Sequence, residues 1–288
     1  MRKAFSVIFL FLWLLNPAYA WTHGNNSGQF QIVLIYDSST SSAPAGFKPA
    51  MNAAAAYLGS LIYLNSTIHI NVGWGEVDGS GVGGDASSVY FLAAIAYTDA
   101  RTALIAHATS ANAMQAVSTL PSSAPSGVSF GVMTTAQEIA LGLTTESGTG
   151  YAFIGFNTGV SWSYSGTPTA GQIDFREAAL HEMMETMGRF ANLSMSFGAG
   201  AMSIQDFYGY ASNGTRNLTT TGARYFSINS GATNQRSFQT SPDYGDWSGG
   251  GLYAGAPSPF DGSATSGQLI PLLPCDFIMI DVLGYSSQ

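Results

Sequence analysis

The sequence predicts an α+β or mixed α/β chain with a regular first half and an irregular second half. From about residue 30 to residue 190, short β-rich runs alternate with helical stretches, which is the pattern of a layered α/β domain. From residue 191 to residue 288 the chain becomes rich in Gly, Ser, Asn and Tyr, and only short runs are strand-like. Because no internal repeat or linker interrupts this arrangement, we expect one domain over residues 21–288.

Apolar periodicity predicts the individual elements. Short apolar, β-rich runs predict strands at residues 31–37, 67–75, 151–157 and 224–229. Ala-rich stretches and apolar residues at helical spacing predict helices at residues 47–64, 97–108 and 274–285.

Turn and capping residues predict further boundaries. The segment at residues 76–88 is rich in Gly and predicts a loop. Thr135 and Glu138 have the spacing of a capping box, which predicts the start of another helix. That helix should end at Gly142 or soon after, and Gly284 should end the last helix of the chain.

The first twenty residues have the layout of a cleaved secretory signal peptide. Arg2 and Lys3 form a basic start, residues 7–15 are apolar, and small residues precede a cleavage point after Ala20. The apolar run is too short for a membrane span. We therefore expect an exported protein without a membrane anchor.

Charge and cysteine content narrow the classes of partner. The formal charge is −8, and removal of the signal peptide leaves seven basic against seventeen acidic residues, a formal charge of −10. Since nucleic acids and anionic membranes attract basic surfaces, we expect neither as a partner. Cys275 is the only cysteine, so no disulfide can form within the chain, and the protein relies on its core for stability.

The segment "FREAALHEMMETMGRF", residues 175–190, contains the candidate site. His181 and Glu185 are four residues apart, so on a helix both side chains can point at one place. Imidazole nitrogen and carboxylate oxygen are both zinc ligands. Glu182 lies one step round the helix, where it can reach a metal-bound water without binding the metal, as the general base does in H-E-x-x-H enzymes.

A solvated helix face is the alternative explanation of these residues. In that case Glu177, Glu182 and Glu185 face water, and His181 is their half-buried neighbour. Only 9% of the chain is charged, yet three Glu, one His and two Arg occur within fourteen residues here. The apolar residues that flank them predict that one side of the helix is buried, and this context favours a metal site.

Several segments together resemble a family of secreted bacterial metalloproteases. They are "HEMMETMGR", "QIVLIYDSS", "INVGWGEVDG", "DFYGYASNGTRNL", "YFSINSGATN", "DYGDW" and "DVLGY". Members of that family share an H-E-x-x-E-x-M-G-R helix and often have a PEP-CTERM sorting tail, and the similarity extends over nearly all of residues 30–286. The resemblance implies a metzincin-like zinc-peptidase domain, with an N-terminal mixed sheet, an active-site helix ended by Gly188, and an irregular C-terminal subdomain.

The chain departs from the metzincin pattern at three points. Glu185 replaces the second histidine, Ala191 stands where a third histidine would fall, and no Met-turn is evident. We also expect no sorting tail on this chain. The remaining histidines lie far upstream and have no motif around them: His23, His69 and His107.

A catalytic zinc ion needs a third protein ligand and an open position. Asp206 is the predicted third ligand, because it lies in the part of the chain where metzincins place their last ligand; the alternative is a turn carboxylate that caps local backbone. Tyr210 resembles the tyrosine after a Met-turn and is a candidate for contact with substrate or transition state, unless it packs in the core. The segment that contains Asp243 and Asp246 predicts one of two structures: a loop that binds calcium or substrate, or an ordinary turn.

The resulting hypothesis is a secreted zinc metalloendopeptidase, a monomeric hydrolase of protein or peptide substrates. Glu182 is the predicted general base, which deprotonates a metal-bound water and returns the proton to the leaving amine. An edge strand near residues 151–157 would hold the substrate extended. Two carboxylate ligands would cancel the charge of Zn²⁺ and leave Mn²⁺ or Ca²⁺ as alternatives.

Two other functions compete with this hypothesis. One is a catalytically inactive exported binding or surface protein that keeps a peptidase-like fold, because function depends on the site and not on the fold. The other is a glycosidase that uses Glu182 and Glu185 as its carboxylate pair. The glycosidase is the weaker competitor, since such enzymes place their two carboxylates on opposite sides of a cleft.

Overall fold

The computed structural model describes residues 30–145, 148, 150–193, 197–240 and 243–285. The predicted signal peptide, residues 1–20, lies outside the described residues. Within them the chain is a mixed α+β structure with six α-helices and four small sheets. No helix in this part of the chain has the length and apolarity needed to cross a membrane.

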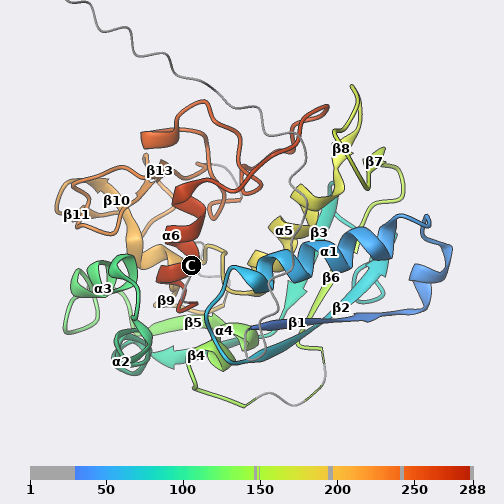
Figure 1. The fold of residues 1–288 in the computed structure, drawn as a ribbon. Helices are drawn as coiled ribbons and strands as arrows, with labels where there is room; N and C mark the ends of the chain where they lie inside the picture. Colours follow the sequence, from blue (N-terminus) through green and yellow to red (C-terminus); the bar gives the residue numbers. More distant parts are fainter. Residues whose placement is uncertain (1–29, 146–147, 149, 194–196, 241–242, 286–288) are drawn as a thin grey trace, which may run out of the picture.

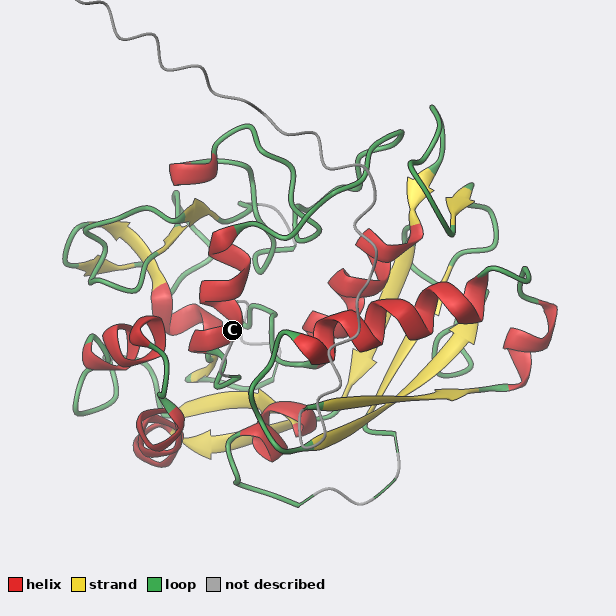
Figure 2. Ribbon diagram, viewed as in Figure 1, coloured by secondary structure: helices red, strands yellow, loops and turns green. Residues whose placement is uncertain are grey.

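The largest sheet has the strand order β1-β2-β6-β3. Its strands are β1 (Gln31–Tyr36), β2 (Thr67–Trp74), β6 (Ala152–Phe156) and β3 (Ala86–Tyr90). The first three are parallel, and β3 is antiparallel to β6 at the edge. Helices α1 (Phe47–Ser60) and α5 (Phe175–Thr186) lie side by side over this sheet (Figures 1 and 2).

An aromatic cluster joins the two helices to the sheet. The ring of Phe47 on α1 lies 5.0 Å from that of Trp74, 5.6 Å from that of Phe156 and 5.3 Å from that of Phe175 on α5. Phe47, Phe156 and Phe175 are fully buried. Burial of one such side chain contributes roughly 1.5–3 kcal/mol, so this cluster holds the start of α5 firmly against the sheet.

A second sheet has the order β4-β5-β9; two short helices, α2 and α4, contact it, and a third, α3, packs against α2. The strands are β4 (Leu92–Ala96), β5 (Phe130–Thr134) and β9 (Ala201–Ser203). The helices are α2 (Tyr97–His107), α3 (Ala111–Ser118) and α4 (Thr135–Ala140).

The irregular part of the chain contains short strands and turns around α6 (Pro274–Val282). A small sheet has the order β11-β10-β12-β13, with β10 (Gly209–Ser212), β11 (Thr215–Arg216), β12 (Tyr225–Phe226) and β13 (Arg236–Ser237). A two-stranded sheet pairs β7 (Trp162–Ser163) with β8 (Ile173–Asp174). Single 3₁₀ turns are η1 (Ser38–Ser42), η2 (Gln205–Tyr208) and η3 (Gly251–Tyr253).

Buried arginines stabilise the irregular half, which has few ladder hydrogen bonds. Arg224 and Arg236 are at most 3% exposed. Arg224 donates to the Tyr244 carbonyl at 2.7 Å, and Arg236 donates to the Ala256 carbonyl at 2.9 Å. Each also binds a carboxylate, and a guanidinium has enough donors to do both. One hydrophobic core contains residues from both halves of the chain, from Phe30 to Tyr285.

The structure corrects several sequence-based boundaries. Residues 76–88 are not all loop, because β3 begins at Ala86 and β4 follows it. The cap of α4 is Thr134 and not Thr135, since the Thr134 hydroxyl accepts from the Gln137 amide at 3.2 Å. Strand β6 lies between β2 and β3, so the predicted substrate-binding edge belongs to β3. The closing helix is correct, and Gly284 follows its end with a φ of 100°.

Candidate metal centre

Helix α5 is held in place at both ends. Its N-cap is Asp174, whose carboxylate accepts from the Arg176 amide at 3.0 Å. At the other end Gly188 adopts a φ of 100°, which favours glycine and turns the chain away. Glu177 and Glu182 are buried and Glu185 is half-buried, so the solvated-face explanation of these glutamates is wrong.

His181 is oriented by a backbone carbonyl. Its Nδ1 atom lies 2.9 Å from the Pro259 carbonyl oxygen. A carbonyl only accepts, so Nδ1 bears the proton and Nε2 faces the other way. Second partners of this kind hold metal-binding histidines in their ligating orientation.

Two carboxylates approach Nε2 of His181 without reaching hydrogen-bond distance. Glu185 Oε1 lies 3.7 Å away and Asp246 Oδ1 lies 3.6 Å away. Ligands at ~2.0–2.2 Å from a tetrahedral ion lie roughly 3.3–3.6 Å from one another. One ligand atom from each of the three residues lies within 4.8 Å of the others, so His181, Glu185 and Asp246 can together hold a metal ion.

The electrostatics of His181 favour a cation at this place. Burial lowers the pKa of the imidazole, but the neighbouring carboxylate of Glu185, with the charges of Asp246 and Glu182, outweighs burial and raises it to about 10. The carboxylates thus stabilise positive charge next to Nε2. A proton or a metal ion can supply that charge.

Arg189 positions Asp246. The Asp246 side chain is 3% exposed, and its Oδ1 atom accepts from Arg189 at 3.2 Å. The guanidinium lies between two rings, 4.7 Å from the centre of Trp247 and 4.3 Å from that of Phe260. It also donates to the Phe260 carbonyl at 3.3 Å. Because these contacts leave Arg189 little freedom, Asp246 is held rigidly toward His181.

Strand β3 positions Glu185. The Ser88 hydroxyl donates to Oε2 of Glu185 at 2.5 Å, which leaves Oε1 directed at His181. Burial raises the pKa of Glu185, but the neighbouring imidazole of His181, the hydrogen bond from Ser88 and the charge of Arg189 lower it below its ordinary value. Glu185 is therefore ionised, as a metal ligand must be.

Glu182 lies beside the three candidate ligands and is 7% exposed. Its Oε2 atom is buried and has no hydrogen-bond partner among the described residues. Burial, followed by the charge of Glu185, raises the pKa of Glu182 well above its ordinary value. In its ionised form, a buried carboxyl group with a free oxygen and a raised pKa is a stronger base than an ordinary carboxylate.

Asp206 is not part of this group, which corrects the sequence-based choice of third ligand. Its Oδ1 atom accepts from Arg224 at 2.8 Å, and its Oδ2 atom accepts from the backbone amides of Asn192 at 2.8 Å and Ser203 at 3.1 Å. Both oxygens are thus occupied, and the residue is fully buried. Asp206 is thus a carboxylate that binds local backbone, which was the alternative explanation of this residue. Asp246 replaces Asp206 as the third candidate ligand.

Tyr210 lies in β10, in contact with Tyr225 at 6.5 Å between ring centres and with the Arg216 guanidinium at 4.9 Å. Tyr210 is 1% exposed, so its position is that of a core residue.

A tyrosine that does lie next to the candidate site is Tyr90. After burial, the charges of Glu185, Asp243, Glu182 and Asp246 raise its pKa. Tyr90 follows Ser88 by two residues on β3, so both side chains face α5.

Sequence reasoning found His181, Glu182 and Glu185 and missed the contributions of Ser88 and Tyr90. Neither residue has a sequence signal, because Ser88 ends the segment predicted as a loop and Tyr90 follows it in a stretch for which no element was predicted. For Asp246 the sequence contained an indication, because "PDYGDW" predicts either a ligand-binding loop or an ordinary turn. The sequence does not show which residue Asp246 would contact. The structure supplies that partner by placing the turn beside α5.

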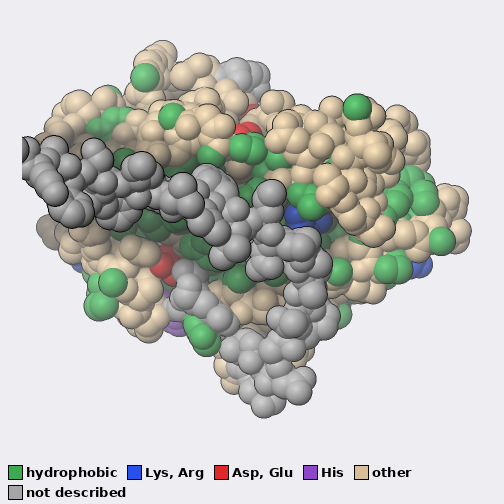
Figure 3. Space-filling view, turned by 45° about the horizontal axis from the view of Figure 1, so that its top comes forward, with side chains coloured by type: hydrophobic (Ala, Val, Ile, Leu, Met, Phe, Trp, Pro, Cys, Tyr) green, Lys and Arg blue, Asp and Glu red, His purple; other side chains and the backbone are tan. Residues whose placement is uncertain are grey.

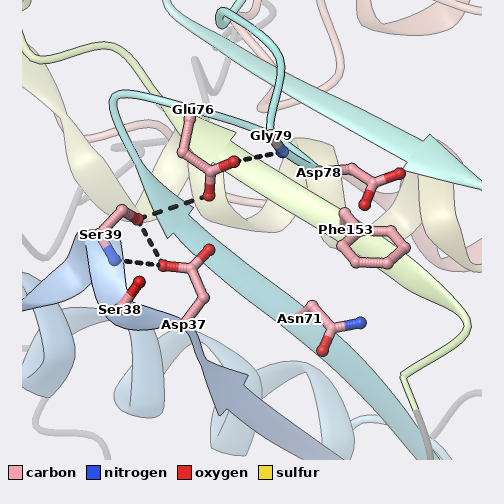
Figure 4. Close-up of a pocket in the computed structure, with 8 residues that line it drawn as sticks. All are labelled: Asp37, Ser38, Ser39, Asn71, Glu76, Asp78, Gly79 and Phe153. Atoms are coloured by element: carbon pink, nitrogen blue, oxygen red, sulfur yellow. Dashed lines mark hydrogen bonds between the residues drawn. The ribbon is translucent and has the colours of Figure 1, made fainter.

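A polar pocket, separate from the candidate metal centre, lies at the carboxyl ends of β1 and β2 (Figure 4). Asp37 and Glu76 point toward each other there, and the neighbouring carboxyl group of Asp37, followed by burial, raises the pKa of Glu76. Asn71 and Phe153 pair in register and line the same pocket. Along β2 and β6, Asn71 and Phe153 alternate with buried residues whose side chains face the helices. Because successive side chains of a strand point to opposite faces, the pocket lies on the face of the sheet opposite α5.

Comparison of the chain with models of protein families, with curated proteins and with solved structures finds no match. The function therefore has to be argued from the site itself.

Proposed function

We propose that the protein is a secreted metal-dependent peptidase in which His181, Glu185 and Asp246 bind a zinc ion and Glu182 is the general base. The supporting observation is the spacing around His181 Nε2, with carboxylate oxygens at 3.6 and 3.7 Å. These distances are too long for hydrogen bonds and close to those between ligands of one tetrahedral ion.

The surroundings of the three ligands support the proposal. Each ligand has its own second partner: Pro259 for His181, Ser88 for Glu185 and Arg189 for Asp246. Such outer partners are typical of metal sites, where they orient the ligands and tune their basicity. The nitrogen ligand favours zinc, while the two oxygen ligands keep Mn²⁺ and Ca²⁺ as alternatives.

Glu182 has the proton-transfer role in this proposal. A bound zinc ion supplies Lewis acidity, which acidifies water and polarises a carbonyl group. The free Oε2 of Glu182 accepts the proton of the attacking water and then delivers it to the amine of the leaving product. The glycosidase alternative has no comparable support, because Glu182 and Glu185 lie on the same helix and Glu185 accepts a hydrogen bond from Ser88 of β3.

The edge of β3 offers a place for an extended substrate. Residues Asp85 and Phe91 exchange backbone hydrogen bonds with the β6 side, at 2.9 and 3.3 Å. By antiparallel alternation the backbone groups of Ala86, Ser88 and Tyr90 therefore point away from β6. A peptide that added to this edge would lie next to Ser88 and so next to Glu185.

The substitution Glu182→Gln tests the catalytic role. It keeps the size of the side chain but removes its basicity, so we expect unchanged zinc content and loss of cleavage of a denatured protein. Elemental analysis and gel electrophoresis measure the two properties. Glu138→Gln on α4 is the matched control and should cleave normally. If wild-type protein binds zinc but cleaves nothing, the inactive binding protein becomes the better description.

A further inference from the structure

Asp276 is a fully buried carboxylate in a protein with few charged residues. Charged side chains make up 9% of the chain, and on the face shown in Figure 3 blue and red appear only as small, isolated patches. Burial of a carboxylate is unfavourable unless it accepts hydrogen bonds. Oδ2 of Asp276 accepts from the Leu273 amide at 2.7 Å, which caps the first turn of α6. This cap does not account for the other contacts of the carboxylate.

One of these contacts reaches the segment of the candidate ligand Asp246. The indole Nε1–H of Trp247, the next residue in the chain, donates to Oδ1 of Asp276 at 2.8 Å. Trp247 is fully buried, and its ring centre lies 4.7 Å from the Arg189 guanidinium, which donates to Asp246 at 3.2 Å. Asp276 thus fixes a ring that confines the arginine partner of Asp246.

A second contact reaches the segment that orients His181. The Ser258 hydroxyl donates to Oδ2 of Asp276 at 3.0 Å and accepts from the Phe260 amide at 3.1 Å. Between these two residues lies Pro259, whose carbonyl oxygen is 2.9 Å from Nδ1 of His181. Asp276 therefore also fixes the loop that holds the imidazole in its ligating orientation.

The two segments are joined to each other as well as to α6. The Trp247 amide donates to the Phe260 carbonyl at 2.9 Å, and the Phe260 ring centre lies 4.3 Å from the Arg189 guanidinium. All three residues are buried. The indole, the phenyl ring and the guanidinium therefore form one buried unit, which the carboxylate of Asp276 connects to the last helix.

We infer that Asp276 is a positioning residue of the candidate metal centre, because its carboxylate fixes the outer partners of two of the three ligands, His181 and Asp246. This inference rests on the proposed function and adds to it a residue of the last helix, which acts through Trp247 and Ser258. Removal of an outer partner typically costs about 10- to 100-fold in metal affinity. Asp276 acts one contact further out, so we expect a loss of about 10-fold.

Titration with Co²⁺ tests this inference, since the visible absorption of Co²⁺ depends on the geometry of its ligands. The chelator-treated full chain and its variants are titrated, and circular dichroism checks that each is folded. Asp276→Ala should bind Co²⁺ about 10-fold more weakly and with altered visible bands. The control Asp281→Ala removes another buried carboxylate of α6, which accepts from Asn112 of α3 at 3.3 Å, and should keep the wild-type spectrum and affinity.

The variants separate failure of this inference from failure of the proposed function. Asp276→Ala with the wild-type spectrum and affinity overturns the inference and leaves the metal site intact. Equal changes in Asp281→Ala overturn it too, because α6 would then act through stability alone. If Asp276→Ala does not fold, Ser258→Ala decides by the same measurements, and an unchanged spectrum overturns the inference. Wild-type protein that binds no Co²⁺ refutes the proposed metal site, and the positioning role with it.

Discussion

The Nε2 atom of His181 lies 3.6 Å from Oδ1 of Asp246, while Nδ1 of the same ring lies 2.9 Å from the Pro259 carbonyl. One nitrogen thus makes a normal hydrogen bond and the other does not. A direct charge-assisted contact would close to about 2.7–2.9 Å. The longer distance, repeated at 3.7 Å with Glu185, leaves room for an ion between the three side chains.

The hydrogen bond from Ser88 to Glu185 predicts the effect of Ser88→Ala. The substitution removes the group that orients the carboxylate, so zinc affinity should fall about 10-fold while the fold is retained. Calorimetric titration of chelator-treated protein with Zn²⁺ measures the change. Ser87→Ala is the control, because the Ser87 hydroxyl donates to the Gly83 carbonyl at 2.7 Å. Equal losses in both variants would contradict the role of Ser88.

The buried pair of Asp206 and Arg224 predicts a stability effect without a metal effect. Asp206→Asn leaves the Arg224 guanidinium without its anion, so the free energy of unfolding should fall by about 3–5 kcal/mol. Urea denaturation measures this loss. Zinc affinity of the variant, measured under conditions where it is folded, should equal that of the wild type. Loss of zinc without loss of stability would return Asp206 to the position of metal ligand.

Glu177 predicts a pH dependence of stability. Burial is the main cause that raises its pKa from 4.5 to about 8 in the folded protein. Between these values the folded state keeps a proton that the unfolded state releases, so the free energy of unfolding falls as pH rises from 4.5 to about 8.

The variant Glu177→Gln isolates that dependence. It mimics the protonated form at every pH, so its stability should match the wild type at pH ~4 and exceed it by roughly 2–4 kcal/mol at pH ~9. Urea denaturation at a series of pH values measures the difference between the two proteins. Parallel stability curves would show that Glu177 titrates normally.

The sequence predicts the parts of the site that are local. His181, Glu182 and Glu185 lie within one helical turn, and helical periodicity alone brings His181 and Glu185 together. The closing helix and the apolar runs of β1, β2 and β6 are also local patterns, and the structure contains these elements. Capping differs by one residue, because Thr134 and Thr135 are equally good candidates until the backbone of Thr134 is known to be extended.

The remaining parts depend on tertiary contacts that no spacing rule describes. Asp206 was favoured by its position after the helix, but burial beside Arg224 gives it a structural partner. Asp246 reaches His181 because Arg189, itself between two rings, holds it there. Strand β3 was hidden by its Gly-rich flank, and with it Ser88 was missed.

The metal content of the purified protein tests the central claim most directly. Elemental analysis should find about one divalent ion per chain after equilibration with Zn²⁺ and removal of excess. Asp246→Asn should retain the wild-type circular dichroism spectrum and contain no ion, because one of three ligands has lost its charge. A wild-type protein without an ion, or an Asp246→Asn variant with an unchanged ion content, would contradict the assignment of His181, Glu185 and Asp246 as a metal site.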